Sequence, residues 1–183
     1  SPPPPSPPPS PPSMPPLTTM SFPRSSPSSP SLSGAQHLAL SADGNYAFVA
    51  CARQDSLTVV DVGATSPLVA GEVQNRSALD GARRVALDGD YAYVAAYDAD
   101  ALVVISIASP TLPEIVGLYS GPMLDGASAL AAPAGGQHVY PAAALAQTFC
   151  VLTVAAVASP TLRRCAPYRS WRFKDPTSVA VDG

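Results

Sequence analysis

Three cysteines carry the most reactive side chains of the chain, and the spacing of two of them predicts a disulfide. Cys150 and Cys165 are equidistant from a turn centred on Val157 and Ala158. If the chain folds there into a symmetric hairpin, the two cysteines face each other across it, as a disulfide requires. The alternative is a pair of small buried thiols that pack as ordinary core residues. We expect Cys51 to be a buried thiol in a strand rather than a link to another chain.

The triplet Asn75-Arg76-Ser77 is a sequon for N-glycosylation, and it lies between two repeated segments, where we expect a surface loop. Such triplets are also common by chance, so occupancy of Asn75 depends on whether the chain is secreted. The sequon is therefore a candidate modification site that does not by itself define a compartment.

Basic and aromatic side chains alternate near the C-terminal end of the sequence. Five of the ten basic residues fall in this stretch, beside Tyr168, Trp171 and Phe173; they are Arg163, Arg164, Arg169, Arg172 and Lys174. Aromatic rings stack on sugars and cations hold anionic glycans, so the candidate glycan contacts are Arg169, Trp171 and Arg172. The alternative, which we favour, is a connecting strand whose aromatic residues fill a core while its cations are solvated.

The remaining polar residues give little support to metal binding or catalysis. The acidic turns at residues 88–90 and 98–100 offer the oxygens that calcium prefers, but their spacing matches no calcium loop and Asp and Gly are common hairpin residues. His37 and His138 are the only histidines, and neither follows a nucleophile motif. The chain has no glycine-rich phosphate loop and no zinc-ligand spacing. We therefore predict no metal, no cofactor and no enzymatic activity.

Charge and hydropathy exclude two further classes of partner. The formal net charge is −3, and a chain without a basic excess is a poor candidate for binding a nucleic-acid backbone. No segment reaches the roughly 18 to 20 apolar residues that a membrane helix needs. The sequence begins with Ser1 rather than methionine, so we expect a mature or excised piece of a longer chain.

The elements that position these residues are clearest in residues 81–120, where four short apolar runs predict one antiparallel sheet. Asp-Gly-Asp, Asp-Ala-Asp and Ala-Ser-Pro separate the runs, which span residues 84–87, 91–97, 101–107 and 114–119. Asp-Gly between such runs is a hairpin signal, and proline ends a strand because it cannot donate to the ladder.

The same arrangement recurs along the chain from residue 34. Segments that start with Gly-Ala begin at residues 34, 81 and 126, and Ser-Pro follows the apolar runs at residues 55–62, 100–107 and 150–157, which we take as the third strands. Four strands every 45 residues or so are typical of a β-propeller blade. We therefore predict blades at residues 34–80, 81–125 and 126–174, and the start of a fourth at 175–183.

The third of these blades is divergent. His138 stands where the first two copies have Tyr46 and Tyr91, and Pro141 lies in the predicted second strand. Because proline lacks an amide hydrogen, we expect this strand to be interrupted and the blade to be distorted or at an edge.

The run LTVVDV followed by Ser-Pro, with GDYAYVA in the next copy, resembles the LVIVD-repeat family of β-propellers, which occurs in many secreted and surface proteins. The resemblance covers residues 34–183 and is most specific in the first two copies. It implies an all-β fold of four-stranded antiparallel propeller blades, about three and a partial fourth. A propeller closes only with roughly four to eight blades, so we expect further blades of a longer chain or other copies of this one to complete the ring.

Residues 1–33 are a separate Ser/Pro-rich region. Proline fixes its own φ and restricts the residue before it, so residues 1–16 predict an extended polyproline II rod and residues 17–33 a tether. The blocks SPPPP, SPPP and SPP resemble the extensin-type, hydroxyproline-rich glycoproteins of plant and green-algal walls and flagellar surfaces. This resemblance implies hydroxylation and O-glycosylation of the rod, with candidate positions Ser1, Pro2, Pro3, Pro4, Pro5, Ser6, Pro7, Pro8, Pro9, Ser10, Pro11 and Pro12. The alternatives are an inert linker and a ligand for an SH3-type groove.

Together these features favour a structural extracellular glycoprotein, a component of a cell wall, matrix or mastigoneme-like flagellar fibre. Its expected partners are other copies of itself, further blades, other fibre or wall glycoproteins and covalent glycans. An extracellular setting also favours the disulfide between Cys150 and Cys165. The alternative is a secreted β-propeller that binds or processes a glycan or another ligand, with the proline tract as a stalk; its site would then be built from loops of further blades.

Overall fold

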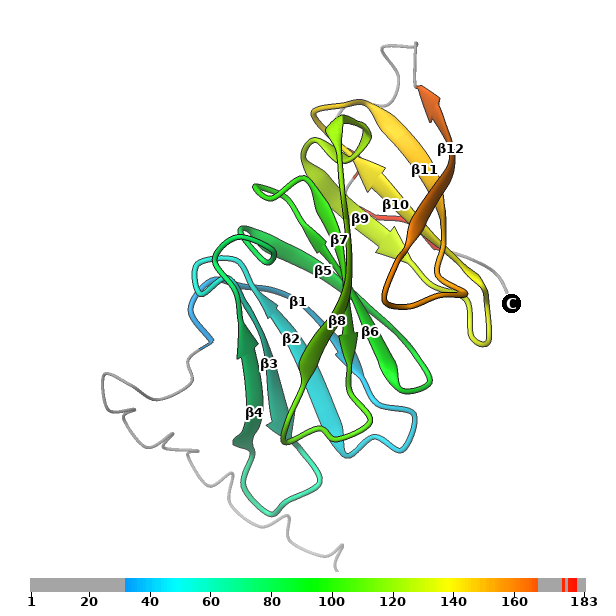
Figure 1. Ribbon diagram of the computed structural model, residues 1–183. Coiled ribbons are helices and arrows are strands. Elements are labelled where there is room, and N and C mark those ends of the chain that lie inside the picture. The colour runs from blue at the N-terminus through cyan, green and yellow to red at the C-terminus, as the bar shows by residue number, and fades with distance from the viewer. Residues whose placement is uncertain (1–31, 168–175, 177, 181–183) are drawn as a thin grey trace, which may run out of the picture.

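The computed structural model in Figure 1 describes residues 32–167, 176 and 178–180. The proline-rich rod of residues 1–16 and the candidate glycan contacts Arg169, Trp171 and Arg172 lie outside these residues, so their predictions stay open. The described chain is all-β, as predicted, and its strands form three four-stranded antiparallel sheets. The one helical element among the described residues is a short 3-10 turn, η1, at Pro122–Leu124.

Each sheet contains four consecutive strands in chain order. The first sheet consists of β1 (Ala35–Leu40), β2 (Tyr46–Cys51), β3 (Ser56–Asp61) and β4 (Leu68–Gln74). The second consists of β5 (Ala82–Asp88), β6 (Tyr91–Ala96), β7 (Ala101–Ser106) and β8 (Glu114–Ser120). The third consists of β9 (Ala127–Ala131), β10 (His138–Ala143), β11 (Thr148–Thr153) and β12 (Thr161–Pro167).

The turn between the second and third strands of each sheet contains a residue in the left-handed region. These residues are Asp55, Asp100 and Gln147, with φ of 53°, 51° and 52°. Aspartate tolerates this conformation well, whereas glutamine does so less readily. The equivalence of Gln147 with the two aspartates places the third strand of the third sheet at Thr148–Thr153. The sequence-based placement at residues 150–157 was wrong because it was anchored on the Ser-Pro pairs, which follow the third strand at variable distances.

The sequence suggested that Pro141 would interrupt the second strand of the third sheet, but the strand is not interrupted there. β10 continues through it, and Pro141 pairs with Leu130 of β9. On the other side, the register between β10 and β11 passes from Val139 opposite Leu152 to Ala142 opposite Phe149. Proline has no N–H to donate, so the strand is preserved while its ladder with β11 has a gap.

The three sheets stack face to face around two apolar cores and do not close into a ring (Figure 1). Side chains of the second sheet alternate between the cores: Val94 and Val103 pack against the first sheet, while Tyr93 and Leu102 pack against the third. This period-two alternation explains why β6 and β7 are apolar on both faces. Phe48, Leu57 and Val59 belong to the first core; Cys150 and Leu152 belong to the second.

Polar contacts repeat where one sheet leads into the next. The Gly81 amide donates to Asp55 Oδ1 at 3.3 Å, and the Gly126 amide donates to Asp100 Oδ1 at 3.0 Å. Each left-handed aspartate therefore connects its own sheet to the glycine that immediately precedes the first strand of the following sheet. Gly81 has φ of 65° and a Cβ there would meet the backbone nitrogen of Asp98 at 2.9 Å, so this junction requires glycine.

Candidate functional site

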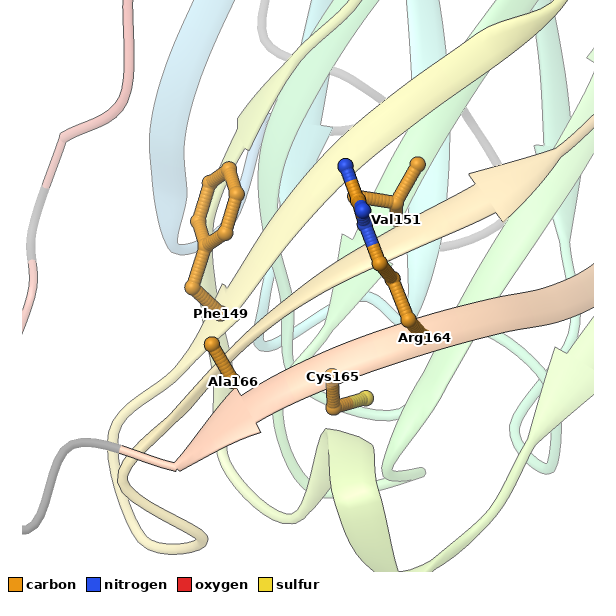
Figure 2. Close-up of a pocket in the computed structure, with 5 residues that line it drawn as sticks. All are labelled: Phe149, Val151, Arg164, Cys165 and Ala166. Atoms are coloured by element: carbon orange, nitrogen blue, oxygen red, sulfur yellow. The ribbon is translucent and has the colours of Figure 1, made fainter.

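A hollow of about 340 Å³ lies on the outer face of the third sheet, the face turned away from the second. Figure 2 shows that Phe149 and Val151 of β11 and Arg164 of β12 project to the same side, whereas Cys165 points to the opposite side. Tyr140 of β10 stacks on Phe149 with ring centroids 6.1 Å apart. The hollow is therefore apolar, with one guanidinium group at its side.

The side chains of this face have counterparts in the other two sheets. The three sheets can be aligned at their left-handed turn residues. In this alignment Tyr140, Phe149 and Val151 correspond to Phe48, Leu57 and Val59 in the first sheet. Their counterparts in the second sheet are Tyr93, Leu102 and Val104. The six counterparts are at most 3% exposed, because the following sheet covers them. Tyr140 and Phe149 are only half-buried. The hollow thus occupies the position at which a following sheet packs elsewhere in the molecule.

The outer strands differ at one position of the same interface. Gly71 of β4 and Gly117 of β8 lie opposite Val59 and Val104, and Arg164 of β12 lies opposite Val151 in the same register. A Cβ at Gly71 would stand 2.5 Å from the Pro110 carbonyl oxygen, and one at Gly117 would stand 1.8 Å from that of Val157. The loop of the following sheet therefore reaches the backbone of these glycines. At the same position the third sheet has the long cationic side chain of Arg164 in place of a glycine.

Cys150 and Cys165 are direct register partners on β11 and β12. Their sulfur atoms are 1.97 Å apart and their Cα atoms 4.1 Å apart. Cys150 is fully buried in the core against the second sheet, so the bond lies on the covered face of the third sheet. Cys51 is the free cysteine of the described chain; it is buried, and desolvation raises the pKa of its thiol, which therefore stays protonated and unreactive.

A second pocket, of about 460 Å³, lies where the β1–β2 turn meets the β5–β6 turn. Its polar groups already have local partners: the Ser41 hydroxyl donates to Asp43 Oδ1 at 2.5 Å, and Asp88 Oδ1 accepts from the Gly135 amide at 2.7 Å. The Ser41 hydroxyl, with further hydrogen bonds from Asn45, lowers the pKa of Asp43 and keeps this carboxylate charged. The pocket therefore has an acidic rim and an apolar interior to which Phe48 and Ile107 contribute.

The histidines lie on different sheets and are not brought together. Nδ1 of His37, on β1, accepts from the Val85 amide at 3.5 Å, and burial followed by the charge of Arg84 lowers the pKa of this imidazole. His138 Nε2 is 2.8 Å from a guanidinium nitrogen of Arg163. Within the described ranges, no group of three or more His, Cys, Asp or Glu side chains is arranged to hold a metal ion. No helix in the same ranges is long and apolar enough to cross a membrane.

Asn75 is exposed and follows directly after β4. Its Oδ1 accepts from the amides of Ser77 and Ala78, both at 3.0 Å, which closes an Asx turn over the sequon. The surface position expected for Asn75 is therefore observed, while its glycosylation stays a prediction. The sequence analysis missed both the hollow and the pocket. The turn residue before each third strand is a signal that would have aligned Phe149 and Val151 with their counterparts in the first two sheets.

Comparisons with known proteins agree with this geometry. Stacked four-stranded antiparallel sheets that each run in chain order define a series of β-propeller blades. The LVIVD repeat model matches residues 35–74 and 81–120, which lie in the first and second blades. The third blade lies outside both matches, in keeping with its divergent sequence. No curated protein matches the chain.

Solved structures match the chain at low sequence identity, which shows the fold alone. Hydrazine synthase of Kuenenia stuttgartiensis is 19% identical with a TM-score of 0.63, over 86% of this chain and 42% of that chain. The periplasmic gluconolactonase of Pseudomonas aeruginosa is 18% identical with a TM-score of 0.61, over 75% and 40%. The Cps50 β-propeller domain of Myceliophteria thermophila is 12% identical with a TM-score of 0.59, over 74% and 43%. The chain spans less than half the length of each of these structures.

Proposed function

We propose that this protein is a structural extracellular glycoprotein, in which a glycosylated proline-rich rod is joined to propeller blades that mediate assembly into a fibre or matrix. The observation that carries the proposal is the pair of outer blade faces. Leu38 and Leu40 of β1 are 55% and 57% exposed, whereas their counterparts in β5 are covered: Val85 is 2% exposed and Leu87 is half-buried. Apolar blade faces of this kind mark contacts with other blades or other copies.

An extracellular location is part of the proposal. Bonded Cys150 and Cys165 suit an oxidising compartment, and the exposed Asx turn at Asn75 leaves the sequon accessible to a glycosyltransferase. The Ser/Pro-rich rod of residues 1–16 would then be the main carrier of sugar, by its resemblance to wall and flagellar glycoproteins.

The test is mass spectrometry of the protein purified from its natural source. We expect hydroxyproline and pentose-containing glycans within residues 1–16 and filaments in negative stain. The internal control is the set of prolines inside the blades, such as Pro110 and Pro141, which we expect to be unmodified. The proposal would be contradicted if residues 1–16 were unmodified and negative stain showed separate particles instead of filaments.

A second candidate function is favoured by the pocket between the β1–β2 and β5–β6 turns. A secreted propeller that binds or processes a ligand would use a pocket of this size, and the similar solved structures include a periplasmic gluconolactonase. Turnover of a lactone, ester or glycan, abolished by Asp88→Asn and unaffected by Asp90→Asn, would support this function. Absence of turnover across the panel, together with a glycosylated filament, would reject it.

A further inference from the structure

The two junctions between blades differ at the turns that join the first and second strands. Asp88 and Ser41 are equivalent, since each is the seventh residue after the glycine that precedes its first strand. Asp88 reaches the next blade, where its Oδ1 accepts from the Gly135 amide at 2.7 Å. Ser41 bonds within its own turn: its hydroxyl donates to Asp43 Oδ1 at 2.5 Å and accepts from the Tyr46 amide at 2.9 Å. The side-chain bridge that Asp88 makes at the second junction is therefore not made by Ser41 at the first.

The pocket of about 460 Å³ lies at this first junction. Its walls include the β1–β2 turn of the first blade and the β5–β6 turn of the second, and Ala134 of the β9–β10 turn also lines it. Because Ser41 turns back into its own loop, its side chain does not span the space between the two turns. The pocket is thus a consequence of one local difference between two otherwise similar junctions.

The interior of the pocket is apolar. Phe48 of β2, Leu87 of β5 and Ile107 after β7 contribute to its lining. A hydroxyl group placed against these side chains would lose its hydrogen bonds to water without gaining others, which is unfavourable. An alkyl chain or an aromatic ring would instead gain the free energy of burying apolar surface. The interior therefore fits the apolar body of a ligand better than it fits a sugar ring.

The rim of the pocket is negatively charged. Asp43 and Asp88 line it, and the lining residues include no Lys, Arg or His. Hydrogen bonds from the Ser41 hydroxyl and from Asn45 hold the Asp43 carboxylate in place. The Gly135 amide occupies Oδ1 of Asp88 and fixes the direction of that side chain. Two oriented carboxylates without a cation in the lining attract a positively charged group and repel an anion.

We propose that this pocket binds a small molecule that carries an ammonium group on an apolar body, with the apolar body inside and the ammonium group at Asp43 and Asp88. The proposal names the ligand class for the second candidate function, and it rests on that function for the use of the pocket as a binding site. It is independent of the fibre or matrix role.

A set of simple probes separates the contribution of charge from that of apolar burial. The full chain is titrated with hexylammonium, butylammonium, hexanol and hexanoate, and binding is followed by the NMR shifts of the backbone amides. Hexylammonium is expected to shift the amides of Ser41, Ala42 and Gly89, which line the pocket. Each buried CH₂ group strengthens binding about fourfold, so hexylammonium should bind about fifteenfold more tightly than butylammonium. Hexanol should bind about fivefold more weakly than hexylammonium, and hexanoate more weakly still.

Asp88→Asn removes one rim charge and leaves the turn contact in place, because an asparagine Oδ1 still accepts from the Gly135 amide. This variant is expected to weaken hexylammonium binding about fivefold and to leave hexanol binding unchanged. The matched control is Asp90→Asn, since Asp90 belongs to the same turn but does not line the pocket, and it should leave both affinities unchanged.

Equal affinity of the parent chain for hexylammonium and hexanol would overturn the proposed ligand class, while the pocket would remain a binding site and the second candidate function would survive. Equal weakening by Asp88→Asn and Asp90→Asn would overturn the assignment of the charge to Asp88. If no probe shifts the pocket amides, both the ligand class and the use of the pocket are wrong. The modification of residues 1–16 is measured separately, so none of these outcomes decides the fibre or matrix role.

Discussion

The second and third blades share one strand pattern but are stabilised differently. The second blade is covered on both faces, and the core strands β6 and β7 are almost fully buried. The third blade is covered by another sheet on one face, has a ladder gap at Pro141, and carries a disulfide between its neighbouring strands β11 and β12. A repeat fold distributes its stability through contacts between neighbours, so a blade with fewer neighbours depends more on internal links.

Truncating the equivalent aromatic side chains should give the largest difference between covered and uncovered positions. Phe48→Ala is expected to lower the free energy of unfolding by about 3–5 kcal/mol, since it leaves a cavity in the core between the first two blades. Tyr140→Ala is expected to cost less than half as much, because its ring is half-buried. Urea denaturation followed by circular dichroism measures both, and equal losses would show that the two positions are equally covered.

Removal of the disulfide should be the next largest effect. The bond closes a loop of 15 residues, for which chain entropy predicts about 3 kcal/mol. The double substitution Cys150→Ala with Cys165→Ala is therefore expected to destabilise the third blade, and reducing agent should destabilise the parent chain but not the double variant. Cys51→Ala is the control for loss of a buried sulfur without loss of a bond. If reducing agent does not change the denaturation of the parent chain, the prediction that the disulfide stabilises the third blade is wrong.

The outer-strand glycines offer a direct comparison at one register position. Gly117→Ala is expected to cost about 1–3 kcal/mol by overpacking, since its Cβ would overlap the Val157 carbonyl oxygen. Arg164→Ala, at the same position of the third blade, is expected to change stability by less than about 0.5 kcal/mol, because Arg164 is exposed. Thermal unfolding measures both. Similar costs would mean that Arg164 is packed as tightly as Gly117.

The sequence predicted the second blade almost completely and the third only in part, and the reason is local turn chemistry. Asp98-Ala99-Asp100 is recognisable as a hairpin, and all four strands of residues 81–120 were predicted. In the third blade Gln147 adopts the left-handed conformation that aspartate adopts in the others, so its third strand was misplaced. Hairpin symmetry alone predicted that Cys150 and Cys165 would face each other. The prediction holds because β11 and β12, on either side of the turn, pair in one ladder. The equivalence of Arg164 with Gly117 depends on a bulge in each outer ladder, which no sequence pattern reveals.

The smallest expected effect concerns Asp80 and Asp125, the acidic residues at the two junctions between blades. Asp80 is exposed, but partial desolvation at the blade junction, and then the charges of Asp55 and Asp98, raise its pKa above the ordinary value of 3.8. The folded chain therefore binds a proton at Asp80 more tightly than the unfolded chain does. The stability gained from this proton is complete below the ordinary pKa and is lost as the pH rises through the raised one. Asp80→Asn should accordingly increase the melting temperature slightly at pH 7 and have no effect near pH 3.

The matched control is Asp125→Asn, since Asp125 precedes Gly126 as Asp80 precedes Gly81, but Leu145 stands there in place of Asp98. One carboxylate fewer at this junction means less repulsion to relieve, so the gain from Asp125→Asn at pH 7 should be smaller than the gain from Asp80→Asn. Melting curves of both variants at several pH values measure the difference. An equal gain at both junctions would mean that Asp98 does not contribute, and a loss for Asp80→Asn would mean that its charge is stabilising in the folded chain.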